Sequence, residues 1–256
     1  MEKQNGIDLK VHLGSDATGE RVCCVFEPTP HLVTVGHALG EKVYLDFEKY
    51  PHLVCIGASG SGKSLALHRM IDELCKNNSP EQVRLFLIDS KVREFPPIEG
   101  EFLVWKESPH LFAPVVMGAE AGREAMTSLC RLVRERIEGR APKDSHLFVF
   151  IDEVLDMVRE EGNQECVDAI NTLVKEGAKA NVHLVMVTLM PRWVFAPNRV
   201  SYEAFPYHLV GRLSDKVDSL VHLGNEEAAM LRGYCGDMIL ATSTDQTHVY
   251  VLRAGE

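Results

Sequence analysis

The chain has 256 residues, of which 45% are hydrophobic and 25% are charged. This length suits one large domain, and this composition excludes a disordered chain. Acidic residues outnumber basic residues by 37 to 27, which gives a formal net charge of −10. That charge argues against a protein whose whole surface binds nucleic acid, although it leaves room for a local basic site.

The sequence contains neither a recognisable targeting signal nor a membrane anchor. The first ten residues are polar and charged, unlike a signal peptide, and no apolar run approaches the ~18–20 residues that span a bilayer. Of the 7 cysteines, only Cys23 and Cys24 are close in sequence, and no CxxC spacing occurs. Because disulfide frameworks and zinc sites need paired spacings, we expect free thiols and a cytoplasmic location.

The apolar runs predict an α/β fold with a mostly parallel central sheet flanked by helices. Residues 1–44 are expected to form a short β-rich extension, with strands over residues 21–26 and 31–35. From residue 45 to residue 256, short apolar runs alternate with helical segments, which is typical of βαβ units. The expected strands cover residues 53–57, 83–88, 147–151 and 183–188, before an antiparallel hairpin over residues 237–241 and 247–252.

The helical segments between these strands are recognised by apolar residues at spacings of three and four. The expected helices cover residues 64–75, 120–138 and 163–180. A further helix is expected to begin after Ser214, as its N-cap, and to end at Gly224.

A glycine-rich loop joins the first of the parallel strands to the helix that follows it. The loop matches the pattern GxxxxGK[ST] at every fixed position, and its members are Gly57, Ala58, Ser59, Gly60, Ser61, Gly62, Lys63 and Ser64. Glycines let backbone N–H groups surround a phosphate, the lysine adds a positive charge, and the serine hydroxyl ligates Mg²⁺. Because a buried-type strand precedes the loop and an amphipathic helix follows it, the loop predicts binding of ATP with Mg²⁺.

A second motif is the acidic pair that ends the apolar strand over residues 147–151. Asp152 is expected to hold Mg²⁺ through water, and Glu153 to orient and deprotonate the attacking water. One further strand is expected between Lys63 and this pair, an arrangement that indicates the RecA-like branch of P-loop ATPases. Thr188, at the end of the next strand, is either a sensor of the γ-phosphate or a residue that caps a turn.

Several further segments give the sequence a specific resemblance to the FtsK/SpoIIIE family of DNA-translocating ATPases. The segments are PHLVCIGASGSGKS, SPEQVRLFLIDSKVREF, SPHLFAPVV, LVRERIEGR, FVFIDEVLDM, NVHLVMVTLMPR, GRLSDKVDS and GDMIL, and their order and spacing both fit the family. The resemblance implies that residues 45–256 form a RecA-like motor domain, which works as a hexameric ring with ATP sites between subunits. It also implies that double-stranded DNA passes through the pore.

The resemblance assigns roles to individual residues. The residues that match the family's ATP and Mg²⁺ ligands are Lys63, Ser64, Asp152 and Glu153. Lys216 matches a lysine that reaches the nucleotide of the neighbouring subunit. Asp89 and Lys91 match the family's IDPK-like stretch, in which Ser90 replaces proline here.

The sequence departs from the family pattern at the positions of the trans-acting and pore-facing residues. Ala178 stands where the family supplies an arginine finger in trans, and the adjacent Lys179 offers charge without the bidentate fork of arginine. Leu189 and Met190 replace a sensor glutamine and a loop arginine, and Leu220 replaces an arginine of the second pore-facing loop. Nearby arginines either compensate for these losses or are structural, and they are Arg192, Arg199, Arg212 and Arg232.

The expected function is an ATP-driven motor that translocates double-stranded DNA in transfer by a mobile element, segregation or packaging. Glu153, Lys63 and Thr188 act within one subunit, and Lys179 and Lys216 from a neighbour stabilise the transition state. A membrane-anchored or DNA-recruiting partner protein is also expected. Two alternatives stay open: an EssC-like ATPase of protein secretion, and a low-turnover ATP-binding subunit of a mixed ring whose finger a partner supplies.

Overall fold

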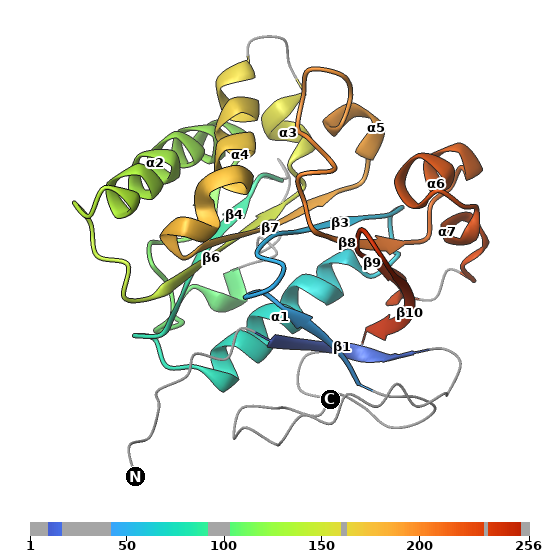
Figure 1. The fold of residues 1–256 in the computed structure, drawn as a ribbon, viewed down its shortest axis with the longest axis horizontal. Helices are drawn as coiled ribbons and strands as arrows, with labels where there is room; N and C mark the ends of the chain where they lie inside the picture. Colours follow the sequence, from blue (N-terminus) through green and yellow to red (C-terminus); the bar gives the residue numbers. More distant parts are fainter. Residues whose placement is uncertain (1–9, 17–41, 92–102, 160–162, 233–234, 252–256) are drawn as a thin grey trace.

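The structure is a computed structural model that describes residues 10–16, 42–91, 103–159, 163–232 and 235–251. Within these ranges, ten strands form one sheet in the order β2-β1-β10-β9-β8-β3-β7-β6-β4-β5. Helices cover both faces of this sheet (Figure 1). The strands expected over residues 21–26 and 31–35 lie outside the described residues.

Neighbouring parallel strands form the half of the sheet that carries the sequence motifs. They are β3 (Leu53–Ile56), β4 (Val83–Asp89), β5 (Val116–Met117), β6 (His146–Asp152), β7 (Val182–Thr188) and β8 (Tyr207–Gly211). Asp89 pairs in register with Asp152, and Ile56 pairs with Thr188. The carboxyl ends of β3, β4, β6 and β7 therefore meet at one edge of the sheet, where both sequence motifs lie.

Antiparallel strands extend the sheet beyond β8. They are β9 (Asp237–Ala241), β10 (Gln246–Val251), β1 (Lys10–Asp16) and β2 (Lys42–Asp46). The pairing of β9 with β10 confirms the expected C-terminal hairpin, and β10 then pairs with β1. Strand β2 contains residue 44, where the β-rich extension was expected to end and the motor domain to begin. That domain boundary stays a prediction.

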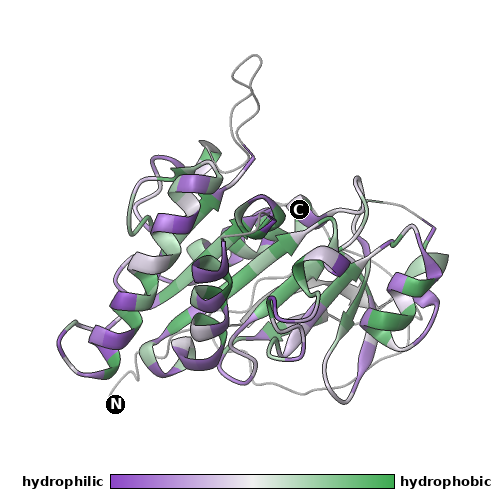
Figure 2. Ribbon diagram, turned by 90° about the horizontal axis from the view of Figure 1, so that it is seen from above, coloured by the Kyte–Doolittle hydropathy of each residue, from purple (hydrophilic) through white to green (hydrophobic). Residues whose placement is uncertain are grey.

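The helices form a layer on each face of the sheet, and each layer encloses its own apolar core. Helix α1 (Lys63–Asn77) covers one face, while α2 (Ala119–Ile137), α3 (Leu155–Val158) and α4 (Gln164–Glu176) cover the other (Figure 1). Along β6, Phe148 points into the α1 core and Val149 into the opposite core, as the alternation of a strand requires. Figure 2 shows that the strands of the sheet are mainly hydrophobic, whereas the helices carry both hydrophobic and hydrophilic residues.

Three short helices follow β7 in the chain. They are α5 (Pro191–Val194), α6 (Lys216–Leu223) and α7 (Glu227–Met230). The expected N-cap of α6 was wrong: Asp215, rather than Ser214, caps this helix, because its carboxylate accepts a hydrogen bond of 2.7 Å from the Val217 N–H. Gly224 ends the helix with φ 75°, as expected.

One further expectation needs correction, and one strand was not predicted at all. The segment over residues 163–180 is not one helix: α4 ends at Glu176 and the 3₁₀ helix η2 (Gly177–Ala180) follows, ended by Asn181 in the left-handed region. Strand β8 was missed, since its short apolar run gives no periodic signal of its own.

No helix within the described ranges is both long and apolar enough to cross a lipid bilayer.

Candidate functional site

The glycine-rich loop leaves β3 at the carboxyl edge of the parallel strands and leads directly into α1. The Ala58 N–H donates to the carbonyl of Arg212 at 2.7 Å, and the Ser61 N–H donates to the carbonyl of Ala58 at 3.2 Å. Gly62, the N-cap of α1, adopts a left-handed φ of 100°. This conformation curls the loop around the start of α1, where backbone N–H groups and the helix dipole favour a bound phosphate.

The loop is held from outside by Gly236, the residue before β9. A Cβ atom on Gly62 would lie 2.3 Å from the Gly236 nitrogen, and one on Gly236 would lie 2.6 Å from the carbonyl oxygen of Val251. The Gly236 N–H also donates to the carbonyl of Ser61 at 3.1 Å. Only glycine fits at both positions, so the C-terminal hairpin helps to shape the phosphate loop.

The ammonium group of Lys63 lies inside the loop. It donates to the carbonyls of Gly57 and Ala58, at 2.9 Å each, and burial lowers the pKa of Lys63 from its usual range. The buried hydroxyl of Ser61 has no hydrogen-bond partner among the described residues. A cation and a free hydroxyl within a glycine cradle fit the phosphates of a nucleotide.

The acidic pair follows β6 and is almost completely buried, with 2% of Asp152 and 3% of Glu153 exposed. The Thr188 hydroxyl donates to Oε1 of Glu153 at 2.9 Å, and the Leu189 N–H donates to Oε2 at 3.0 Å. Glu153 adopts a left-handed φ of 55°, which costs an L-residue about 1–2 kcal/mol. Backbone strain of this kind persists where the surroundings hold it, and it is concentrated at functional sites.

Thr188 and Glu153, which were predicted to have separate roles, contact each other directly. Thr188 is fully buried at the end of β7 and contacts the carboxylate of Glu153. Its role as a γ-phosphate sensor stays a prediction, as does the role of Ser64 and Asp152 as Mg²⁺ ligands. No sequence signal indicated the contact that the backbone N–H of Leu189 makes with Glu153.

The segment after β4 also joins the site. The Ser90 hydroxyl donates to the carbonyl of Asp152 at 2.9 Å and to the carbonyl of Glu153. The Lys91 ammonium lies 3.6 Å from Oδ2 of Asp152 and 3.9 Å from Oε2 of Glu153. In the sequence, Ser90 and Lys91 stand out only by their resemblance to a family stretch, and no sequence signal predicts these contacts.

The predicted trans-acting residues do not join the site of their own chain. Ala178 and Lys179 are exposed on η2, which precedes β7 and so lies at the opposite edge of the sheet from the phosphate loop. Lys216 begins α6, and its ammonium pairs with the carboxylate of Glu226. The role of Lys179 in trans stays a prediction.

The loops expected to face cargo carry apolar side chains. We define the α5–α6 face as the exposed residues Met190, Trp193, Val217, Leu220 and Val221. Arg192 links α5 to α6, because its guanidinium pairs with Asp215 at 2.7 Å and with Asp218. The charge of Arg192 is therefore compensated within the chain, and this arginine does not replace the missing loop cations.

The other arginines near these loops differ in their surroundings. Arg199 donates to the carbonyl of Val158 and is half-buried, so it is structural. The side chains of Arg212 and Arg232 are exposed.

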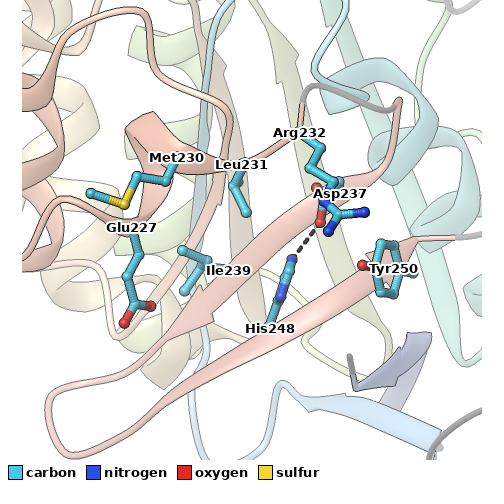
Figure 3. Close-up of a pocket in the computed structure, with 8 residues that line it drawn as sticks. All are labelled: Glu227, Met230, Leu231, Arg232, Asp237, Ile239, His248 and Tyr250. Atoms are coloured by element: carbon cyan, nitrogen blue, oxygen red, sulfur yellow. Dashed lines mark hydrogen bonds and ion pairs between the residues drawn. The ribbon is translucent and has the colours of Figure 1, made fainter. Parts of the chain in front are cut away.

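A pocket beside the C-terminal hairpin lies apart from the phosphate loop (Figure 3). Its lining residues are Glu227, Met230, Leu231, Arg232, Asp237, Ile239, His248 and Tyr250. Because Met238 and Leu240 point into the α1 core, their neighbours Asp237 and Ile239 point to the other face of the sheet. Asp237 and Ile239 thus line the pocket from the face of the sheet opposite α1.

These features together define a P-loop nucleoside triphosphatase fold of the RecA-like type, with one strand between the phosphate-loop strand and the acidic strand. A family model described as "FtsK/SpoIIIE family" matches residues 27–140. The DNA translocase FtsK of Leptospira interrogans is 28% identical over 260 residues, which cover 93% of this chain and 24% of the relative. The chain is therefore similar to the FtsK/SpoIIIE family over these residues, and it spans about a quarter of that relative's length.

Solved structures share this fold over almost the whole chain. The cytoplasmic domain of the Thermomonospora curvata type VII secretion ATPase EccC has a TM-score of 0.70 and 19% identity, covering 96% of this chain and 29% of that one. The pCW3 conjugation coupling protein TcpA, with ATPγS, has a TM-score of 0.70 and 18% identity, covering 95% and 70%. These likenesses support the fold described above.

Proposed function

We propose that this chain hydrolyses ATP to move double-stranded DNA, and that it works in the cytoplasm as a ring, which we infer to be hexameric. The observation that carries the proposal is the buried carboxylate of Glu153, held by Thr188 and Leu189 one strand away from the phosphate loop. The DNA translocase relatives support DNA as the cargo. The biological process, whether DNA transfer, segregation or packaging, and any recruiting partner belong to the same proposal.

The residues of the site divide the work of hydrolysis. The loop N–H groups and Lys63 bind the phosphates. Ser64 and Asp152 would hold Mg²⁺, which would supply further positive charge to the phosphates. Glu153 accepts a proton from the attacking water as the water oxygen bonds to the γ-phosphorus. The bond from this phosphorus to the bridging oxygen breaks, which releases ADP and phosphate.

The hydrogen bonds to Glu153 contribute by fixing its carboxylate before the reaction begins. Two donors from the end of β7 hold the two oxygens of this side chain. A base that is already oriented needs little reorganisation in the transition state.

The ring supplies the remaining charges. Lys179 of one subunit approaches the phosphate loop of the next, which accounts for its position at the far edge of its own sheet. Lys216 lies at the start of α6, on the phosphate-loop side of the sheet. In the ring, its ammonium leaves the ion pair with Glu226 and binds the nucleotide of the neighbouring subunit.

The test is a steady-state ATPase assay of the purified chain with and without duplex DNA, at about 50 and about 200 mM salt. We expect DNA to stimulate turnover at least about tenfold, with weaker stimulation at the higher salt concentration. Glu153→Gln should lower kcat by about a thousandfold without loss of nucleotide binding, whereas Glu138→Gln, an exposed change of the same charge, should have no effect. A chain that binds ATP but ignores DNA at both salt concentrations would contradict DNA as the cargo.

A second candidate function is the movement of polypeptide, and the α5–α6 face favours it. Its exposed side chains are apolar, and Arg192 is compensated by Asp215 and Asp218. Such a surface suits apolar and basic peptide side chains better than phosphates. The type VII secretion ATPase EccC supports this candidate at the level of the fold.

The same assay separates the two candidates. An apolar, basic peptide should stimulate turnover if polypeptide is the cargo, and Trp193→Ala should weaken that stimulation. Stimulation by duplex DNA alone would reject polypeptide as the cargo.

A further inference from the structure

We propose that Ser90 and Lys91 are positioning residues for Glu153: Ser90 acts on the backbone of the acidic turn, and Lys91 acts on its carboxylate. The inference rests on the proposed hydrolysis of ATP, but it is independent of the cargo. Neither residue touches the phosphate loop through a described hydrogen bond, so both act through the acidic pair.

The register of the sheet brings the segment after β4 alongside the acidic turn. Asp89 is paired with Asp152 across β4 and β6, and the next residue, Ser90, is 5% exposed. The Ser90 N–H donates to the carbonyl of Asp152 at 3.4 Å, and its hydroxyl donates to the carbonyls of Asp152 and Glu153. Ser90 therefore holds both peptide groups of the turn in which Glu153 adopts φ 55°.

Serine supplies both kinds of donor at this position. Its backbone N–H and its hydroxyl contact the acidic turn at its strained residue. A proline here would have no backbone N–H and no hydroxyl, so it could make neither contact.

Lys91 supplies charge to a pair of buried acids that are adjacent in sequence. Its ammonium lies within 4 Å of one oxygen of Asp152 and one oxygen of Glu153. Buried carboxylates need a compensating partner, and the Lys63 ammonium hydrogen-bonds to loop carbonyls instead.

The two sides of Glu153 are therefore occupied by groups from different strands. Thr188 and Leu189 hold the carboxylate from the β7 side, and Lys91 faces it from the β4 side. Loss of Lys91 leaves the hydrogen bonds from Thr188 and Leu189 in place but removes the positive charge on the other side of the Glu153 carboxylate. We therefore expect turnover to suffer while nucleotide binding, which depends on the phosphate loop, survives.

The first test compares Lys91→Met and Lys91→Arg with Lys76→Met, a matched change at an exposed lysine that pairs with Asp72. Lys91→Met should lower kcat by about 10- to 100-fold, with the affinity for a fluorescent ADP analogue within about threefold of the original chain. Lys91→Arg should restore most of the activity, and Lys76→Met should change neither quantity. For the backbone contact, Ser90→Ala should lower kcat about threefold to tenfold, and Ser90→Thr should restore it.

The second test does not depend on turnover. Lys91 lies beside Asp152, so its loss should strengthen binding of Mn²⁺ to the ADP complex about fivefold, as measured by electron paramagnetic resonance. A variant that was merely misfolded would bind Mn²⁺ more weakly.

Several results would overturn the inference. They are a Lys91→Met chain with kcat within twofold of the original, a parallel loss of kcat and ADP affinity, failure of Lys91→Arg to restore activity, or Mn²⁺ binding that is not strengthened. If the original chain hydrolyses no ATP with any cargo, the proposed function fails instead. The Mn²⁺ measurement then tests the charge that Lys91 places beside the acidic pair, and Mn²⁺ binding that is not strengthened overturns the inference without reference to turnover.

Discussion

The Thr188 hydroxyl donates a hydrogen bond of 2.9 Å to Oε1 of Glu153, so the last residue of β7 orients the carboxylate that follows β6. The same hydroxyl oxygen accepts a hydrogen bond from the Met190 N–H at 3.2 Å. Thr188 thus connects the candidate catalytic base to the first residue of the α5–α6 face. The Leu189 N–H, which donates to Oε2 of Glu153 at 3.0 Å, makes a second connection between the same two segments.

Replacement of Thr188 by valine should reduce turnover. Valine keeps the branched shape in the fully buried position but cannot donate to Glu153, so we expect kcat to fall about 10- to 100-fold. Steady-state ATPase measurements check this, with Thr188→Ser as the matched control that keeps the hydroxyl. Equal activity of the valine and serine variants would show that the hydrogen bond has no role in turnover.

Two glycines of the phosphate loop should differ sharply in their tolerance of alanine. At Gly62, a Cβ atom meets the Gly236 backbone at 2.3 Å, whereas at Gly60 (φ 77°) it meets no atom within 4 Å. Gly60→Ala should cost about 1 kcal/mol for its left-handed conformation alone. Gly62→Ala should cost about 3 kcal/mol or more and abolish nucleotide binding. Urea unfolding and binding of a fluorescent nucleotide measure both effects, and similar losses for the two variants would contradict the steric argument.

Ala178→Arg should raise ATP hydrolysis if Lys179 and its neighbours act in trans. An arginine at this exposed position would offer a bidentate fork to a phosphate in another subunit, and we expect kcat to rise about tenfold or more. The rise should appear only at protein concentrations where the chain assembles, which dilution series measure. A low-turnover subunit of a mixed ring would gain activity in this way, whereas robust turnover of the original chain, abolished by Glu153→Gln, would argue against that alternative.

Addition of two cations to the α5–α6 face should strengthen binding of duplex DNA. Met190 and Leu220 are 49% and 47% exposed, so Met190→Arg with Leu220→Arg places both charges in solvent. Each new phosphate contact should steepen the dependence of log K on log salt by about 0.9. Fluorescence anisotropy at several salt concentrations measures this slope. Phe112→Arg, at another exposed position (43%), should leave the slope almost unchanged, and an equal effect of this control would show that only net charge matters.

The stability of the chain should fall in mild acid because of two buried histidines, His52 and His183, and the half-buried His146. His146 contacts His183 at 2.8 Å, and the Leu184 N–H donates to His52. Burial lowers the pKa of His52 and His146 to about 4 and that of His183 to about 3. Histidine in an unfolded chain has a pKa of about 6.5, so the unfolded state binds more protons between these values. Their contribution is complete above about pH 6.5 and is lost progressively as the pH falls towards 4.

We therefore expect the free energy of unfolding to drop by about 1–2 kcal/mol per histidine between about pH 7.5 and about pH 5. Urea unfolding at the two pH values measures this difference. His146→Gln removes one titrating group and should shrink it. A difference that is unchanged in this variant would assign the acid sensitivity to other groups.

The sequence alone determined those parts of the site that are contiguous in the chain. The loop from Gly57 to Ser64 needs only eight neighbouring residues between a strand and a helix to form a phosphate cradle. The acidic residues Asp152 and Glu153 were evident because an apolar strand ends on them. The βαβ order of the parallel strands was predictable for the same reason, since each unit is local.

Only the tertiary structure decided which ends of these units meet. Parallel strands that are neighbours in the sheet are separated in sequence by a crossover, so the contacts of Glu153 with Thr188 and with Lys91 depend on β6 lying between β7 and β4. The support that Gly236 gives to Gly62 and the pairing of Arg192 with Asp215 likewise join distant segments. A sequence motif specifies which groups can bind and react, whereas the packing of the sheet sets the positions from which they act.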